Sequence, residues 1–79
     1  MEFEWDDAKR EMNIEKHGVD FLDVLELFDQ KPRVKKSPYP DEERFLATGI
    51  LRGRRITVVY TLREDRIRLI SARKARKNE

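Results

Sequence analysis

The chain has 79 residues, of which 43% are charged and 38% hydrophobic, with one histidine and no cysteine. This length supports a single hydrophobic core, so residues 1–79 are expected to form one domain. The absence of cysteine excludes disulfides and thiolate zinc sites, and one histidine offers no metal cluster, so we expect no metal site and no cofactor. The apolar runs are far shorter than a membrane helix, and we therefore expect a cytoplasmic protein that does not contact membranes.

The first part of the chain predicts a short strand followed by two helices. Polar and apolar residues alternate over Glu2–Trp5, as they do in a strand. A helix is predicted over Asp7–Lys16, because acidic residues favour a helix start and Gly18 favours a stop. Asp20 is a favoured N-cap for a second helix, whose apolar residues recur at helical spacing: Phe21, Val24, Leu25 and Phe28.

After Pro32 the pattern changes to the two-residue period of strands. Arg33–Ser37 is a possible edge strand. Three longer segments rich in branched and aromatic residues follow, separated by short turns: Arg44–Leu51, Arg54–Leu62 and Arg66–Ala72. We therefore predict an α+β fold in two layers, with two N-terminal helices packed on one face of an antiparallel meander. The other face is left to polar and basic side chains.

The net charge of +2 conceals two parts of opposite sign. Residues 1–43 contain seven Lys and Arg against thirteen Asp and Glu, which gives −6, whereas residues 44–79 contain eleven against three, which gives +8. Nine of these eleven cations are arginines, whose planar guanidinium suits bidentate contacts with phosphate. The second part is thus a candidate polyanion-binding surface, although composition alone fits a solvated charged surface equally well.

Strand alternation places Arg66 and Arg68 on one face of the last strand, opposite Ile67, Leu69 and Ser71. We expect the remaining cations to gather with them along one edge and end of the sheet, namely Arg54, Arg73, Lys74, Arg76 and Lys77. Single-stranded RNA is recognised by base stacking combined with phosphate contacts, and Tyr60 near the predicted rim is a candidate for stacking. Packing in the core is the more common role of such a tyrosine.

His17 is the one side chain suited to proton transfer near neutral pH, which phosphodiester cleavage requires. Its position just before Gly18 also suits an ordinary helix cap, and that is the more common role of an isolated histidine. Lys16 beside it is equally typical of an exposed surface. The sequence contains no glycine-rich phosphate loop, nucleophile elbow or metal-ligand spacing, which argues against nucleotide hydrolases and metallonucleases.

Three segments together resemble one family of proteins. They are Phe3-x-Trp5-Asp6-x-x-Lys9, then Asn13-x-x-Lys16-His17-Gly18-Val19-x-Phe21, and finally Ile67-Arg68-Leu69-Ile70-Ser71-Ala72-Arg73-x-Ala75. In order and spacing they resemble the BrnT toxins, and the resemblance extends over nearly the whole chain. It implies a RelE-like fold and a metal-independent ribonuclease toxin of a type II toxin–antitoxin pair, which inhibits translation by cleaving RNA. It also implies a BrnA-like antitoxin, through which the complex binds operator DNA.

The resemblance also suggests which residues act on RNA. The positions that match the family are candidate catalytic residues: Lys16, His17, Arg44, Arg68 and Arg73. Candidate RNA-binding residues, which rest on the expected geometry instead, are Arg54, Tyr60, Arg66 and Arg76. The implied reaction is attack of a ribose 2′-hydroxyl on the adjacent phosphate, with cations stabilising the developing charge. The alternative is a module that binds nucleic acid or a protein partner through the same basic face without chemistry.

Overall fold

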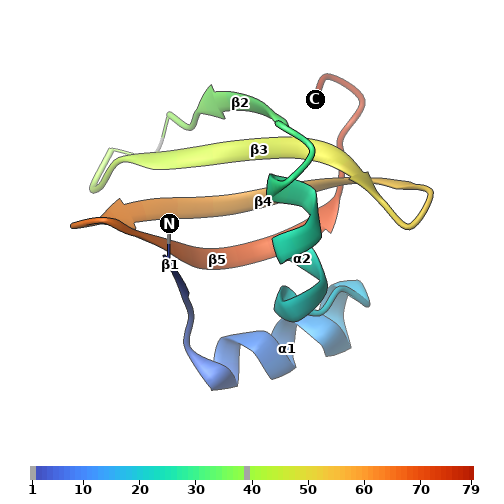
Figure 1. Cartoon of the computed structure of the whole chain (residues 1–79), viewed down its shortest axis with the longest axis horizontal. Helices are drawn as coiled ribbons and strands as arrows, with labels where there is room; N and C mark the ends of the chain where they lie inside the picture. Colours follow the sequence, from blue (N-terminus) through green and yellow to red (C-terminus); the bar gives the residue numbers. More distant parts are fainter. Residues whose placement is uncertain (1, 39) are drawn as a thin grey trace.

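The computed structural model describes residues 2–38 and 40–79, which form a five-stranded mixed sheet and two helices (Figure 1). The strands are β1 (Glu2–Glu4), β2 (Arg33–Lys36), β3 (Arg44–Leu51), β4 (Arg54–Arg63) and β5 (Arg66–Lys74). The helices are α1 (Asp7–His17) and α2 (Phe21–Phe28). The predicted α+β fold is confirmed, with each predicted element present within two residues of its expected bounds.

The helix boundaries follow from local capping. The Asp6 carboxylate accepts a hydrogen bond from a first-turn N–H of α1, and Asp20 does the same for α2. Gly18 ends α1 in the left-handed conformation with φ 69°, and its N–H donates to the Ile14 carbonyl at 2.8 Å. Arg10 of α1 pairs with the capping carboxylate of Asp20 at 2.8 Å, so one ion pair also links the two helices.

The sheet has the strand order β1-β5-β4-β3-β2. β3, β4 and β5 form the predicted antiparallel meander, and β2 pairs with β3 at one edge. Arg52 and Gly53, with φ of 52° and 81°, join β3 to β4 in a two-residue turn whose positive φ angles match the twist of a hairpin. β1 adds a parallel pairing with β5 that makes the sheet mixed, and only the folded chain reveals this pairing.

The core lies between α2 and one face of the sheet. The α2 side chains of Phe21, Val24 and Leu27 are fully buried there. The same buried cluster includes Ile56 and Val58 of β4 and Leu69 and Ala72 of β5. Gly49 of β3 allows α2 to approach closely, because a Cβ atom at that position would lie 3.1 Å from Leu27 Cγ.

A register shift in β5 changes which residues share a face. Val59 pairs with Ser71, whereas Tyr60 pairs with Leu69, so Ile70 is an extra residue without a partner in β4. Simple alternation predicted Ser71 on the side of Ile67 and Leu69, and that prediction is wrong. The bulge moves Ser71 onto the opposite side, in line with Arg68 and Arg73.

α1 packs against β5, and Figure 1 shows it running alongside that strand. β1 covers the outer edge of β5 only over Arg66–Arg68, so the edge beyond is left to α1. Within the described chain, neither helix combines the length and apolar character that crossing a bilayer requires.

Candidate functional site

The sheet face opposite α2, here called the open face, is rich in cations. Residues on this face are identified by their pairing with each other and by their alternation with the buried residues of the core. Its basic side chains are Arg33, Lys35, Arg44, Arg55, Arg63, Arg66, Arg68 and Arg73. This arrangement confirms the prediction that the second face is basic, although the apolar side chains of Leu46, Ile50 and Val59 also lie on it.

The predicted gathering of basic residues at one end of the sheet is confirmed for Arg54 and Lys74, which line one pocket there, and is wrong for Arg66 and Arg68. β4 and β5 run antiparallel, so Arg66 lies beside Arg63 at one end, while Arg73 lies beside Thr57 towards the other. The open face therefore has two separate basic regions, one around Arg66 and Arg68 and one around Arg73.

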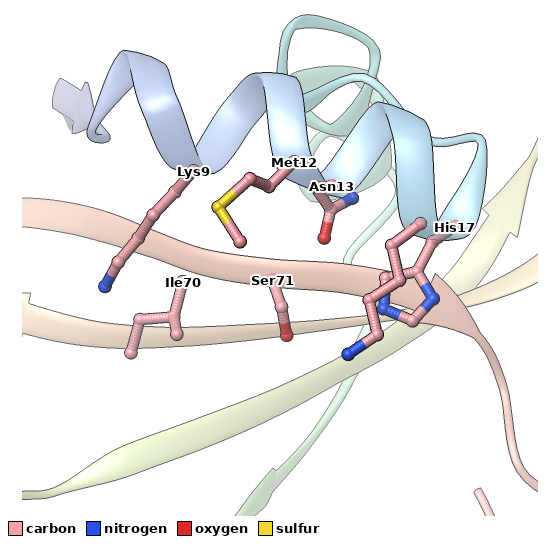
Figure 2. Close-up of a pocket in the computed structure, with 7 residues that line it drawn as sticks. Lys9, Met12, Asn13, His17, Ile70 and Ser71 are labelled. Carbon is pink, nitrogen blue, oxygen red and sulfur yellow. The ribbon is translucent and has the colours of Figure 1, made fainter.

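A surface pocket of about 200 Å³ lies between α1 and β5 (Figure 2). Figure 2 shows Lys9, Met12 and His17 reaching from α1 towards Ile70 and Ser71 of β5. The remaining lining residues are Asn13 and Lys16. The two predicted candidates Lys16 and His17 are thus brought to one pocket, together with a second lysine and the Ser71 hydroxyl.

Asn13 holds this side of α1 against the strand edge. Its side chain is buried, with 5% of the residue exposed. The amide nitrogen Nδ2 donates to the carbonyl oxygens of Val19 and Ala72, both at 2.9 Å, and Oδ1 accepts from the Ala72 N–H at 3.0 Å. The side-chain amide thus pairs with Ala72 as a neighbouring strand would, which fixes the position of the α1 residues that line the pocket.

Several cations form no ion pair within the described residues, in the pocket and also on the open face, where Arg33, Lys35, Arg55 and Arg63 form none. Within the described chain Lys9, Lys16 and His17 form no ion pair. Their positive or proton-exchanging groups thus meet the pocket without a neutralising carboxylate.

The predicted arginines on the open face each meet a carboxylate. Arg68 Nη1 lies 2.7 Å from Glu4, and Arg66 lies 3.4 Å from the same side chain. The Arg68 guanidinium, with Arg66 beside it, lowers the pKa of the Glu4 carboxyl. Arg44 Nε lies 2.9 Å from Glu42. These contacts orient the guanidinium groups while leaving them partly accessible.

Arg44 and Arg68 lie in one row across the open face. Arg44 of β3 pairs with Thr61 of β4, and Thr61 pairs with Arg68 of β5. The Thr61 hydroxyl between them in this row donates to the Glu43 carbonyl at 2.6 Å. Two predicted catalytic residues distant in sequence are therefore brought to one row.

Arg73 is held by Glu79 in the segment that follows β5. Its two terminal nitrogens donate to the two carboxylate oxygens of Glu79 at 2.8 and 2.9 Å. This bidentate pair, together with hydrogen bonds from Thr57 and the Arg76 N–H, lowers the pKa of Glu79 to about 2.

Two predicted RNA-binding residues lie away from the open face. Tyr60 is 8% exposed, on the side of the sheet that packs against α2, with its ring between Phe28 and Phe45 at centroid distances of 5.4 Å. Arg54 is exposed but also faces the α2 side, because it pairs with Leu51 of the core. Side chains alternate along β4, so Arg54 and Tyr60 lie on the same side of the strand as the buried Ile56 and Val58.

Sequence reasoning missed four residues of this region: Lys9, Asn13, Ser71 and Glu79. Lys9, Asn13 and Ser71 stood in the quoted motifs without an assigned role. The signal for Asn13 was a polar residue on the inner side of an otherwise weakly apolar helix. No role was predicted for Glu79 from the sequence, since its role depends on the chain turning back.

Within residues 2–38 and 40–79, no three His, Asp or Glu side chains gather to hold a metal ion.

Comparison with known proteins identifies the family. Residues 5–79 match the family described as the ribonuclease toxin BrnT of type II toxin–antitoxin systems. The chain belongs to the BrnT family. It is 34% identical to the Brucella abortus ribonuclease toxin BrnT, whose crystal structure at 1.1 Å superimposes with a TM-score of 0.74. That match covers 98% of this chain and 99% of the other. A comparison with curated proteins finds no match.

Membership of the BrnT family agrees with the fold and confirms the resemblance stated from the sequence. The chain is a BrnT ribonuclease toxin of a type II toxin–antitoxin system. The family does not assign roles to individual residues of this chain, and the geometry described above is the basis for assigning them.

Proposed function

We propose that this BrnT chain cleaves RNA at the pocket between α1 and β5, without a metal ion. The observation that supports this site is that two lysines, Lys9 and Lys16, line one pocket together with His17 and Ser71. Family membership supplies the substrate class, and the pocket supplies cations and a proton-transfer group. Arg44, Arg68 and Arg73 on the adjacent open face bind the phosphates that flank the cleaved bond.

The reaction is an internal transfer at phosphorus. The ribose 2′-oxygen attacks the neighbouring phosphate, its proton passes to the His17 imidazole, and the bond from phosphorus to the 5′-oxygen breaks. The leaving 5′-oxygen takes a proton from a water molecule, the hydroxide formed recovers the proton held by His17, and the products are a 2′,3′-cyclic phosphate and a 5′-hydroxyl. The ammonium groups of Lys9 and Lys16 stabilise the charge that develops on the phosphate oxygens.

Incubation of the purified, antitoxin-free chain with labelled RNA in EDTA tests this proposal. We expect discrete products that persist in the chelator and are lost in Lys16→Ala and His17→Ala, and reduced in Arg68→Ala and Arg73→Ala. Lys36→Ala is the matched control, because Lys36 is an exposed lysine on the edge strand β2, whose side chain pairs with Glu43. RNA that is bound but left intact, with and without ribosomes, would support the non-catalytic binding module instead.

The cellular role follows from the same proposal. We expect RNA cleavage in the cytoplasm to inhibit translation, and a BrnA-like antitoxin to neutralise the chain and to supply all contacts with operator DNA. Support comes from the type II family to which the chain belongs. Expression of the chain should arrest growth, co-expression of the antitoxin should restore it, and the chain alone should not bind operator DNA.

A further inference from the structure

The Glu79 carboxylate occupies a set of donors that suits a phosphate. Its Oε1 accepts hydrogen bonds from Arg73 Nη1, the Thr57 hydroxyl and the Arg76 N–H, each at 2.8 Å. Its Oε2 accepts from Arg73 Nη2 at 2.9 Å. A guanidinium fork, a hydroxyl and a backbone N–H converging on two oxygens form the same donor set that holds the two non-bridging oxygens of a phosphodiester.

This anion site is enclosed and lies on the open face. The side chains of Arg73 and Glu79 are 16% and 6% exposed. Thr57 is fully buried beneath them, and its hydroxyl lies 2.8 Å from that of Thr48 in β3. Donors held in place this way lose little freedom when an anion binds, so the site is preorganised.

The anion site adjoins the proposed cleavage pocket. Arg73 and Ser71 lie two residues apart on the same side of β5, and Ser71 lines the pocket with Lys16 and His17. An RNA strand with its cleaved phosphate in the pocket therefore brings a neighbouring phosphate to the region of Arg73.

The segment that delivers Glu79 turns back across the sheet after β5 (Figure 1). The Ala75 N–H donates to the Arg55 carbonyl at 2.9 Å, and Arg55 in turn donates to the main-chain oxygen of Glu79. Between these contacts Lys77 and Asn78 are exposed. Glu79 thus makes most of the contacts that keep this segment on the open face. An RNA phosphate that takes the place of the Glu79 carboxylate releases the segment.

We propose that Arg73, Thr57 and the Arg76 N–H form a phosphate subsite for RNA, and that Glu79 is a resident competitor that RNA displaces. This inference rests on the proposed function, since it assigns a neighbouring phosphate of the same substrate. The Arg73 pair lowers the pKa of Glu79 to about 2, so Glu79 stays ionised at weakly acidic pH as well as at neutral pH, and the competition operates over that range.

The test measures binding of a 2′-O-methyl RNA oligonucleotide, which lacks the attacking hydroxyl and stays intact. Glu79→Ala and Glu79→Gln should each bind this RNA about three- to tenfold more tightly than the natural chain. One additional phosphate contact should also make the slope of log K against log salt steeper by about 0.7 in Glu79→Ala. Glu11→Ala and Glu11→Gln are the matched controls for loss of one negative charge, because Glu11 is exposed on α1.

The double variant Glu79→Ala with Arg73→Ala tests whether the tighter RNA binding depends on Arg73. It should bind RNA no more tightly than Arg73→Ala alone, because the subsite is then absent. Circular dichroism checks that each variant is folded, and Glu79→Gln provides the comparison if Glu79→Ala unfolds. Equal or weaker RNA binding by the folded Glu79 variants would overturn the inference and make Glu79 a positioning residue for Arg73.

Cleavage of ordinary RNA, measured separately, keeps the two proposals distinct. Tighter binding by Glu79→Ala with no cleavage by any variant would leave the subsite standing and reject the ribonuclease mechanism. Cleavage by the natural chain without tighter binding by the Glu79 variants would support the ribonuclease mechanism and reject the phosphate subsite.

Discussion

Replacing Asn13 with alanine tests whether one side-chain amide holds α1 to the sheet. The substitution removes three hydrogen bonds of 2.9, 2.9 and 3.0 Å and leaves the N–H and C=O of Ala72 without that partner. At a net value of about 1 kcal/mol for each bond, plus part of the cost of burying unpaired backbone groups, the loss in unfolding free energy is about 3–4 kcal/mol. A domain of 79 residues has a total stability on the order of 4–12 kcal/mol.

Urea denaturation measures this loss directly. With a denaturant slope of about 1.5–2 kcal/mol/M, the midpoint should fall by roughly 2 M in Asn13→Ala. Glu11→Ala, an exposed change on the same helix, should alter stability by less than about 0.5 kcal/mol and serves as the control. A loss below about 1 kcal/mol in Asn13→Ala would refute the reasoning, because it would mean that water replaces the amide at the strand edge.

Three further outcomes follow from other parts of the molecule. Arg10, and then a backbone N–H, lower the pKa of Asp20 from 3.8 to about 2, so its stabilising contribution is complete above pH about 4 and is lost as pH falls through 2. Urea midpoints measured from pH 7 to 2 should therefore fall less steeply in Asp20→Asn. Gly49→Ala should lower stability by about 1–2 kcal/mol in the same assay, because its Cβ would lie 3.1 Å from Leu27 Cγ, and an unchanged midpoint would mean that α2 shifts freely. His17→Ala should lower the cleavage rate by about 10²–10⁴ while affinity for 2′-O-methyl RNA stays within about twofold, whereas equal activity would make His17 only a helix cap.

Local pattern was sufficient to predict most of the elements of this fold. Asp20 and the buried residues that follow it defined α2, because capping and helical periodicity are both local properties. The strands of the meander were predicted for the same reason, by alternation and short turns. Only the bounds changed, with β5 extending to Lys74.

Features that depend on contacts between distant segments were not predictable in this way. The parallel pairing of β1 with β5 joins residues more than 60 positions apart. The bulge at Ile70 shifts the alternation of side chains along β5 by one residue, and no turn residue or glycine in this segment indicates it. Asn13 and Glu79 acquire their roles from backbone and side-chain partners that only the folded chain supplies.

The candidate site shows the same division between local and distant information. Lys16 and His17, selected from family positions, line one pocket, and their catalytic role stays a prediction. Strand alternation correctly placed Arg66 and Arg68 together on one face. Predicting whether Tyr60 is exposed requires knowing which face of the sheet is buried, and that depends on where α2 packs. The Tyr60 ring lies in the core with Phe28, so it has no exposed surface on which an RNA base could stack.

The bulge at Ile70 determines how the two parts of the site relate to each other. Without it, Ser71 would face the core and the α1 pocket would be separated from the open face by an apolar row. With it, Ser71 lies in line with Arg68 and Arg73 while also lining the pocket that holds His17. β5 therefore carries Arg68, Ser71 and Arg73 along one side, with Lys16 and His17 of α1 at its edge. Under the mechanism that we propose, a single RNA strand running along β5 meets phosphate contacts on both sides of His17, the residue that takes the proton of the 2′-hydroxyl.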